Sequence, residues 1–179
     1  MEQKIFILGD SRTGTTSLFE FFRRVGFSAI HYFVDEAGLQ RPLHKFHDEN
    51  WNKVHTFIEE NSFQVFSDYP TRTFYKELAA AYPDSYFILS ERKSVEKWQN
   101  SMVRFFEKQD ITFDLDKLTQ AYLLGNRDIG NFFEEGEFHF LKICIDDENM
   151  DNTKVIKDFL QLDTEETLLQ LNKSNRTSA

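Results

Sequence analysis

Short apolar segments alternate along the chain with stretches in which apolar residues recur every three or four positions. A short apolar run bounded by turn residues is typical of a buried strand, whereas the longer spacing is typical of a helix that packs on one face. The order strand, helix, strand, helix favours a parallel sheet covered by helices on both faces. The predicted strands are Lys4–Leu8, Phe63–Ser67, Ser85–Ser90 and Phe138–Ile145, with Ile30–Val34 as an ambiguous fifth.

The segments whose apolar residues have helical spacing lie between these strands and after the last one. Because right-handed crossovers bring the carboxyl ends of parallel strands to one edge, polar residues that follow the strands are expected to meet there. The sequence therefore predicts an α/β fold in three layers, with a central parallel sheet of about four to five strands. The predicted helices are Thr15–Val25, Phe74–Ala81, Val95–Phe105, Leu115–Phe132 and Val155–Leu160.

Composition narrows the class of protein. The length of 179 residues suits one domain, predicted over residues 1–173 with a frayed tail at 174–179. Lys and Arg number 21 against 30 Asp and Glu, and the formal charge of −9 disfavours nucleic acid as the main partner. A single cysteine, Cys144, leaves no internal disulfide and no Cys-rich zinc site, and suits a reducing compartment. The apolar runs are far shorter than the roughly 20 residues of a membrane span, and a cytoplasmic location is predicted.

A glycine-containing loop follows the first predicted strand and leads directly into a helix. The spacing from Gly9 to Gly14 equals that of the phosphate-binding loop Gly-x4-Gly-Lys-Ser/Thr, in which backbone N–H groups and a helix N-terminus surround an anion. Thr15 stands where that loop has its lysine, and Arg12 is the only cation in the segment. This context favours a phosphate site and a P-loop (nucleotide-kinase-like) fold, with an arginine placed to contact a group being transferred.

The loop resembles that of the sulfotransferases that use 3′-phosphoadenosine 5′-phosphosulfate (PAPS). Many of them read Pro-Lys-Ser-Gly-Thr-Thr, and a compact subgroup reads Gly-Arg-Thr-Gly-Thr-Thr-Ser-Leu. This chain reads Ser-Arg-Thr-Gly-Thr-Thr-Ser-Leu from Ser11 to Leu18. Two later blocks appear in the subgroup's order: Asp-Tyr-Pro at Asp68–Pro70, and an arginine-to-serine segment at Arg92–Ser101 that follows a Tyr-Pro pair and a strand. Several blocks in order are much more specific than one loop.

The resemblance implies which residues hold the donor. The 3′-phosphate is expected on Arg92 and Ser101, with Asn100 as the second choice because the family's spacing from arginine to serine ends there. The family's Asp-Pro after the arginine is Lys93-Ser94 in this chain. An Asn-bearing loop that closes the family's domain is similar to the segment around Asn172 and Lys173. The 5′-phosphosulfate is expected on Ser11, Arg12, Thr13, Gly14, Thr15 and Thr16.

The implied reaction moves a sulfonate group in line from PAPS to a hydroxyl or amine of a small-molecule or carbohydrate acceptor, without a metal. Arg12 is expected to stabilise the charge on the leaving oxygen. Asp68, with His31 as runner-up, is the candidate base. The 20 phenylalanines suggest an apolar acceptor pocket, whereas His44 and His47 lack a third metal ligand. Two alternatives remain open: a small-molecule kinase on the same fold, which the missing loop lysine disfavours, and a non-catalytic nucleotide-binding relative.

Overall fold

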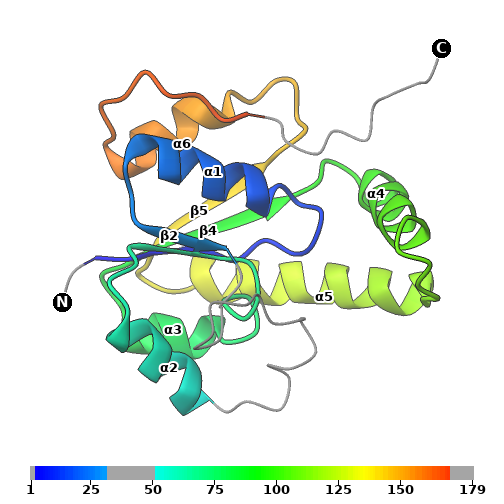
Figure 1. Ribbon diagram of the computed structural model, residues 1–179, viewed down its shortest axis with the longest axis horizontal. Coiled ribbons are helices and arrows are strands. Elements are labelled where there is room, and N and C mark those ends of the chain that lie inside the picture. The colour runs from blue at the N-terminus through cyan, green and yellow to red at the C-terminus, as the bar shows by residue number, and fades with distance from the viewer. Residues whose placement is uncertain (1–2, 32–50, 170–179) are drawn as a thin grey trace.

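The computed structural model describes residues 3–31 and 51–169. They form a five-stranded sheet in the order β2-β3-β1-β4-β5, in which every neighbouring pair is parallel. This arrangement confirms the predicted α/β fold (Figure 1). The elements are β1 (Ile5–Ile7), α1 (Thr15–Val25), β2 (Ala29–His31), α2 (Trp51–Glu60), β3 (Val65–Ser67), α3 (Tyr75–Ala81), β4 (Tyr86–Glu91), α4 (Val95–Glu107), α5 (Leu115–Glu134), β5 (His139–Cys144) and α6 (Asn152–Leu160).

Alternating side chains divide the core between the two faces of the sheet. In β1, Ile5 and Ile7 pack in the cluster that contains α1 and α6, whereas Phe6 packs in the cluster that contains α2, α3 and α5. Figure 1 shows the same division, with α1 and α6 above the sheet and α2, α3 and α5 below it. Phe6 stacks on Phe66 and Phe87 of the two neighbouring strands, at ring-centroid distances of 5.6 and 5.5 Å. Many of the phenylalanines therefore fill the core rather than a ligand pocket.

Two features differ from the predicted elements. Helix α2 was not predicted, although Val54 and Ile58 lie one turn apart and are both buried. Strands β1, β3 and β5 are shorter than the apolar runs that predicted them. An apolar run reports burial, and residues such as Leu8 are buried although they lie beyond the end of the strand. The ambiguous fifth strand is β2, and residues 32–34 of that prediction lie outside the described residues, as do His44 and His47.

Helix starts distinguish α1 from three later helices. The side chains of Ser94, Asp114 and Asp151 each accept a hydrogen bond from the backbone of the first turn of α4, α5 and α6. Such caps satisfy N–H groups that the helix itself leaves without partners. The N-cap residue of α1 is instead Gly14, and in the described part of the chain no side chain caps this helix. The start of α1 therefore lacks the side-chain cap that these three helices have.

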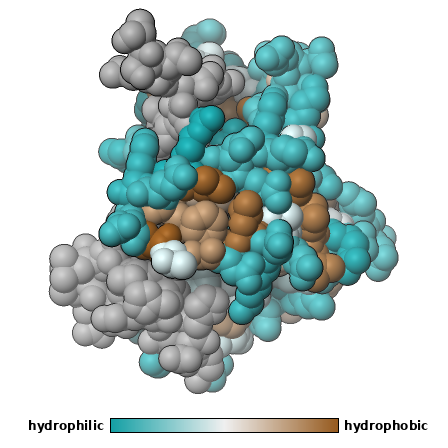
Figure 2. Space-filling view, turned by 90° about the vertical axis from the view of Figure 1, so that its right-hand side faces the viewer, coloured by the Kyte–Doolittle hydropathy of each residue, from teal (hydrophilic) through white to brown (hydrophobic). Residues whose placement is uncertain are grey.

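The face that carries α4 has a mixed character. Apolar residues gather near its centre and hydrophilic residues surround them (Figure 2). Within residues 3–31 and 51–169, none of the helices combines the length and the apolar character that crossing a membrane requires.

Candidate functional site

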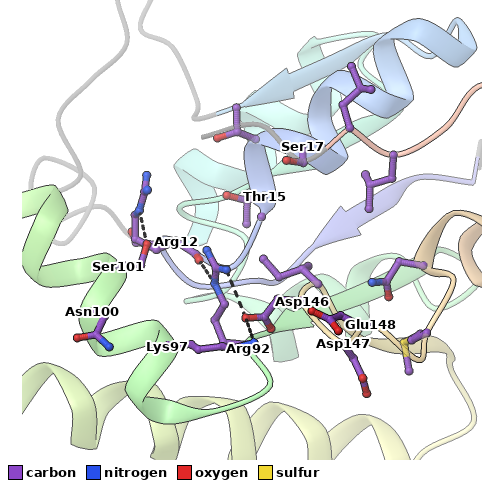
Figure 3. A pocket seen from close by; sticks show the side chains of 18 of the residues that line it. Arg12, Thr15, Ser17, Arg92, Lys97, Asn100, Ser101, Asp146, Asp147 and Glu148 are labelled. Carbon is purple, nitrogen blue, oxygen red and sulfur yellow. Dashed lines mark hydrogen bonds and ion pairs between the residues drawn. The ribbon is translucent and has the colours of Figure 1, made fainter. Parts of the chain in front are cut away.

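A cleft of about 710 Å³ opens at the carboxyl edge of the sheet. Its walls come from the loop after β1, the residue after β3, Arg92 after β4, helix α4 and the segment that follows β5 (Figure 3). Open parallel sheets bind ligands at this edge, because the loops after neighbouring strands converge there. The residues that the sequence analysis singled out after separate strands are thus brought into one place.

The loop after β1 curls so tightly that two positions require glycine. A Cβ atom on Gly9 would lie 2.1 Å from the Ser90 hydroxyl oxygen. Gly14 has a φ of 88°, and a Cβ there would lie 2.9 Å from Ile145. Arg12 also adopts a positive φ, 68°, which is uncommon for a residue with a side chain. The turn directs the uncapped start of α1 toward the cleft, and an anion is stabilised at such a helix end.

The backbone of this loop is held from α4, α5 and the end of β4. The indole N–H of Trp98 donates to the carbonyl of Ser11 at 3.0 Å, and the Trp98 ring stacks on Tyr122 with centroids 4.3 Å apart. The Nε of Arg92 donates to the carbonyl of Arg12 at 2.7 Å. On the other flank, Arg72 lies 3.5 Å from the Asp10 carboxylate. The shape of the loop is therefore imposed by tertiary contacts as well as by its glycines.

Arg12 contributes the cationic side chain of the loop. Its Nε donates to the hydroxyl of Ser101 at 3.0 Å, and its guanidinium lies 5.5 Å from the centre of the Phe105 ring. Ser101 is buried on α4, whereas Asn100 beside it is exposed, and both line the cleft. Arg12, Arg92 and Ser101 thus lie together, as Figure 3 shows. Of the two alternatives on α4, Ser101 is the one that contacts the loop.

Thr13 differs from the expectation that it holds a ligand. Its side chain is fully buried, donates to the Asp10 carbonyl at 2.6 Å and lies 3.1 Å from the Ser90 hydroxyl. Its backbone N–H also donates to the Asp10 carbonyl. Because both of its donors close the turn, Thr13 braces the loop and does not line the cleft, which Ser11, Gly14, Thr15 and Thr16 do.

Asp68 and His31 form a pair at the ends of β3 and β2. The Nε2 atom of His31 lies 3.8 Å from Oδ2 of Asp68, and both side chains are largely buried. Thr15 donates to Asp68 at 3.0 Å, and the Thr16 hydroxyl lies 3.3 Å from His31 Nε2. The two threonines therefore join the loop to this pair. Asp68 lines the cleft, while His31 is packed against Phe19 behind it.

Burial moves the protonation equilibria of the pair toward the neutral forms. Burial raises the pKa of the Asp68 carboxyl above its ordinary value, although His31, the Tyr69 N–H and the Thr15 hydroxyl favour the ionised form. Burial likewise lowers the pKa of the His31 imidazole, against the charges of Asp68 and Glu20. A carboxylate whose pKa is raised toward neutrality is a better proton acceptor than an ordinary exposed one.

A family model for the sulfotransferase domain matches residues 4–160 of the chain. The chain belongs to the sulfotransferase family. Among solved structures, the crystal structure of a sulfotransferase from Alicyclobacillus acidocaldarius is similar, with a TM-score of 0.54 and 14% sequence identity over 98% of this chain and 87% of that chain. At this identity the likeness concerns the fold. No curated protein sequence matches the chain significantly. Family and fold support sulfonate transfer as the general class of activity.

The donor-binding residues expected of a sulfotransferase are only partly described. Arg92 and Ser101 lie at the cleft, while Asn172 and Lys173 lie outside the described residues. In residues 3–31 and 51–169, no group of three or more His, Cys, Asp or Glu side chains is arranged to hold a metal ion.

Sequence reasoning missed the acidic side of the sulfotransferase cleft. Asp146 follows β5 and lies 3.6 Å from Arg92 and 3.4 Å from Lys97. Burial raises the pKa of Asp146, but the Lys93 N–H, Arg92 and Lys97 outweigh this effect and hold the pKa below its ordinary value. The signal was an acidic run directly after a predicted strand, and its importance depended on β5 pairing with β4.

Proposed function

We propose that the chain is a sulfotransferase that uses PAPS as its donor and a small molecule with a hydroxyl or amine as its acceptor. The observation that supports this most is the uncapped start of α1 in the same cleft as Arg12 and Arg92. This combination offers backbone N–H groups and two guanidinium groups to a ligand with two separate anionic groups. The family membership of the chain agrees with that ligand class.

The residues present fit such a donor. Gly14 allows the start of α1 to lie close to Ile145 in the wall of the cleft, because a side chain at this position would collide with Ile145. We expect the 5′-phosphosulfate at Ser11, Arg12, Gly14, Thr15 and Thr16, and the 3′-phosphate at Arg92 and Ser101. When bound, the donor supplies the sulfonate group that is transferred. Arg12 stabilises negative charge on the donor side by its fixed positive charge and its hydrogen bonds, since its guanidinium remains protonated at neutral pH.

Asp68 takes the acceptor proton in this proposal. Its carboxylate lines the cleft and is oriented by the Thr15 hydroxyl and by the Tyr69 N–H at 2.7 Å. His31 lies behind it at 3.8 Å and stabilises the ionised form of Asp68 when its own imidazole is protonated. Because the two groups interact, their apparent pKa values belong to the pair. The pair can therefore hold a proton next to Thr15 of the loop.

The acceptor is expected to approach Arg12 from the side of Phe105. This ring lines the cleft, and behind it Phe106 packs edge-on to Phe105 and stacks on Phe113 with centroids 4.6 Å apart. The face that carries α4 has an apolar centre in Figure 2. An acceptor with an apolar or aromatic body fits this wall. Activity confined to highly charged polysaccharides would contradict this part of the proposal.

The test is calorimetric titration with adenosine 3′,5′-bisphosphate, beside ATP with and without Mg²⁺. Micromolar binding of the bisphosphate without metal, lost in Arg92→Ala and kept in Arg23→Ala, is expected. Arg23 is a matched control because its exposed side chain pairs with Glu20 on α1 and does not line the cleft. In a transfer assay, Arg12→Ala should lower turnover about 100- to 1000-fold, the usual effect of removing one donor to developing charge.

A kinase remains the second candidate because of one contact. The Thr15 hydroxyl and the Asp68 carboxylate lie 3.0 Å apart, and both are oxygen ligands of the kind that Mg²⁺ takes. Tighter binding of Mg²⁺-ATP than of the bisphosphate would overturn the sulfotransferase proposal in favour of this one. Nucleotide binding without any turnover would favour the non-catalytic relative.

A further inference from the structure

One carboxylate of the cleft already contacts Arg92, the cation expected to bind the 3′-phosphate, and the neighbouring Lys97. Oδ2 of Asp146 lies 3.6 Å from Arg92 and 3.4 Å from Lys97, and Figure 3 shows Arg92 directed toward it. Only 18% of the Asp146 side chain is exposed. Arg92 therefore faces a protein anion, whereas 53% of the Lys97 side chain is also exposed to solvent.

The position of Asp146 is fixed independently of those two side chains. Its Oδ1 accepts a hydrogen bond of 2.7 Å from the backbone N–H of Lys93, just before α4. The residue directly follows the Ile145 backbone, which is bonded to the Glu91 carbonyl at the end of β4. A phosphate that reached Arg92 would consequently approach a carboxylate that the backbone holds in place, and like charges at such distances repel.

We propose that Asp146 is a specificity-determining residue that competes with the 3′-phosphate of the donor for Arg92 and Lys97. Asp146 thereby narrows the difference in affinity between adenosine nucleotides that carry a 3′-phosphate and those that carry only a 5′ group. The proposal rests on the proposed function, since it concerns the same donor site. It concerns recognition of one phosphate and leaves the transfer step unchanged.

The experiment measures the dissociation constants of adenosine 3′,5′-bisphosphate and of AMP by calorimetry. The proteins are the unmodified chain, Asp146→Asn and the matched control Asp147→Asn. Asparagine keeps the size of Asp146 and an acceptor for the Lys93 N–H while removing the charge. Asp147→Asn is a suitable control because it removes the same charge one residue away. The Asp147 carboxylate lies 2.8 Å from the exposed side chain of Lys93.

We expect Asp146→Asn to bind the bisphosphate about three- to tenfold more tightly than the unmodified chain at low salt, which is the range that two partly exposed ion pairs allow. Its affinity for AMP should stay within about twofold of that of the unmodified chain. High salt should shrink the gain. Asp147→Asn should change neither affinity by more than about twofold. If Asp146→Asn is unstable, Asp146→Ser is used instead, with the same expected selectivity.

Weaker binding of the bisphosphate in Asp146→Asn would overturn the proposal, because Asp146 would then position Arg92 for the phosphate. An equal gain for the bisphosphate and AMP, or an equal gain in Asp147→Asn, would also overturn it, because the effect would then be one of general charge. If neither nucleotide binds to any of the proteins, the proposed function itself fails and this proposal fails with it.

Discussion

Replacing Trp98 with phenylalanine tests whether α4 holds the loop after β1. The substitution removes the hydrogen bond from the indole N–H to the Ser11 carbonyl, 3.0 Å long, and keeps an aromatic ring to stack on Tyr122. A hydrogen bond of this kind contributes about 1 kcal/mol, and a buried carbonyl left without its partner costs about 1–3 kcal/mol. Trp98 is 1% exposed, so the smaller ring also leaves unfilled volume. We expect the free energy of unfolding to fall by about 2–3 kcal/mol.

Equilibrium unfolding in urea gives this free energy, and a thermal melt should show a Tm lowered by about 4–12 °C for a chain of this size. Trp51→Phe is the matched control, because Trp51 is half-buried and stacks on His55 at the start of α2, far from the loop. Affinity for adenosine 3′,5′-bisphosphate should fall in Trp98→Phe and stay unchanged in Trp51→Phe. A Tm change below 2 °C, or equal losses of affinity in the two variants, would refute the reasoning that Trp98 supports the donor site.

Three further predictions concern the site. The ionised form of Asp68 is the base and its pKa is raised above 3.8, so kcat/KM should fall along an acid limb that lies above this value. Asp68→Asn should remove the acid limb and lower the activity about 100-fold or more. His31→Asn should move the acid limb to higher pH, because the variant lacks the charge that lowers the Asp68 pKa. Gly14→Ala should lower the free energy of unfolding by about 1–3 kcal/mol in urea titrations, because its φ is positive and the new Cβ is crowded. Ser101→Ala should weaken bisphosphate binding about fivefold by calorimetry, whereas Asn100→Ala should stay within about twofold, and the reverse order would reassign the phosphate contact.

The local features of the site were predictable from the sequence, because they depend on neighbours in the chain. The spacing of Gly9 and Gly14 between an apolar run and a helical stripe predicted a loop that turns tightly into α1, and the structure has that loop. The fold class followed from the alternation of strands and helices. The burial of the Thr13 side chain could not be foreseen, because it depends on Ser90 of another strand.

The contacts between side chains on neighbouring strands were not predictable, because no single segment of the sequence determines the order of the strands. Asp68 followed a predicted strand and His31 lay within the ambiguous one, but their distance of 3.8 Å results from β2 lying beside β3. In the same way, Asp146 meets Arg92 because β5 lies beside β4. A different strand order would have kept every motif and separated both pairs.

The central place of β1 has a consequence for how the protein is made. The first strand of the chain is flanked on both sides by strands that are synthesised much later, since Ile5 pairs with Val65 in β3 and with Tyr86 in β4. Contacts between distant parts of a chain form only after both parts exist, and they slow folding. The loop at residues 9–16 is translated before Arg92, Trp98 and Tyr122, and it therefore acquires its supports from these residues only after they have left the ribosome. An N-terminal fragment that ends before α4 would carry the whole phosphate-loop motif and Arg92, but not the Trp98 and Tyr122 side chains that support the loop from α4 and α5.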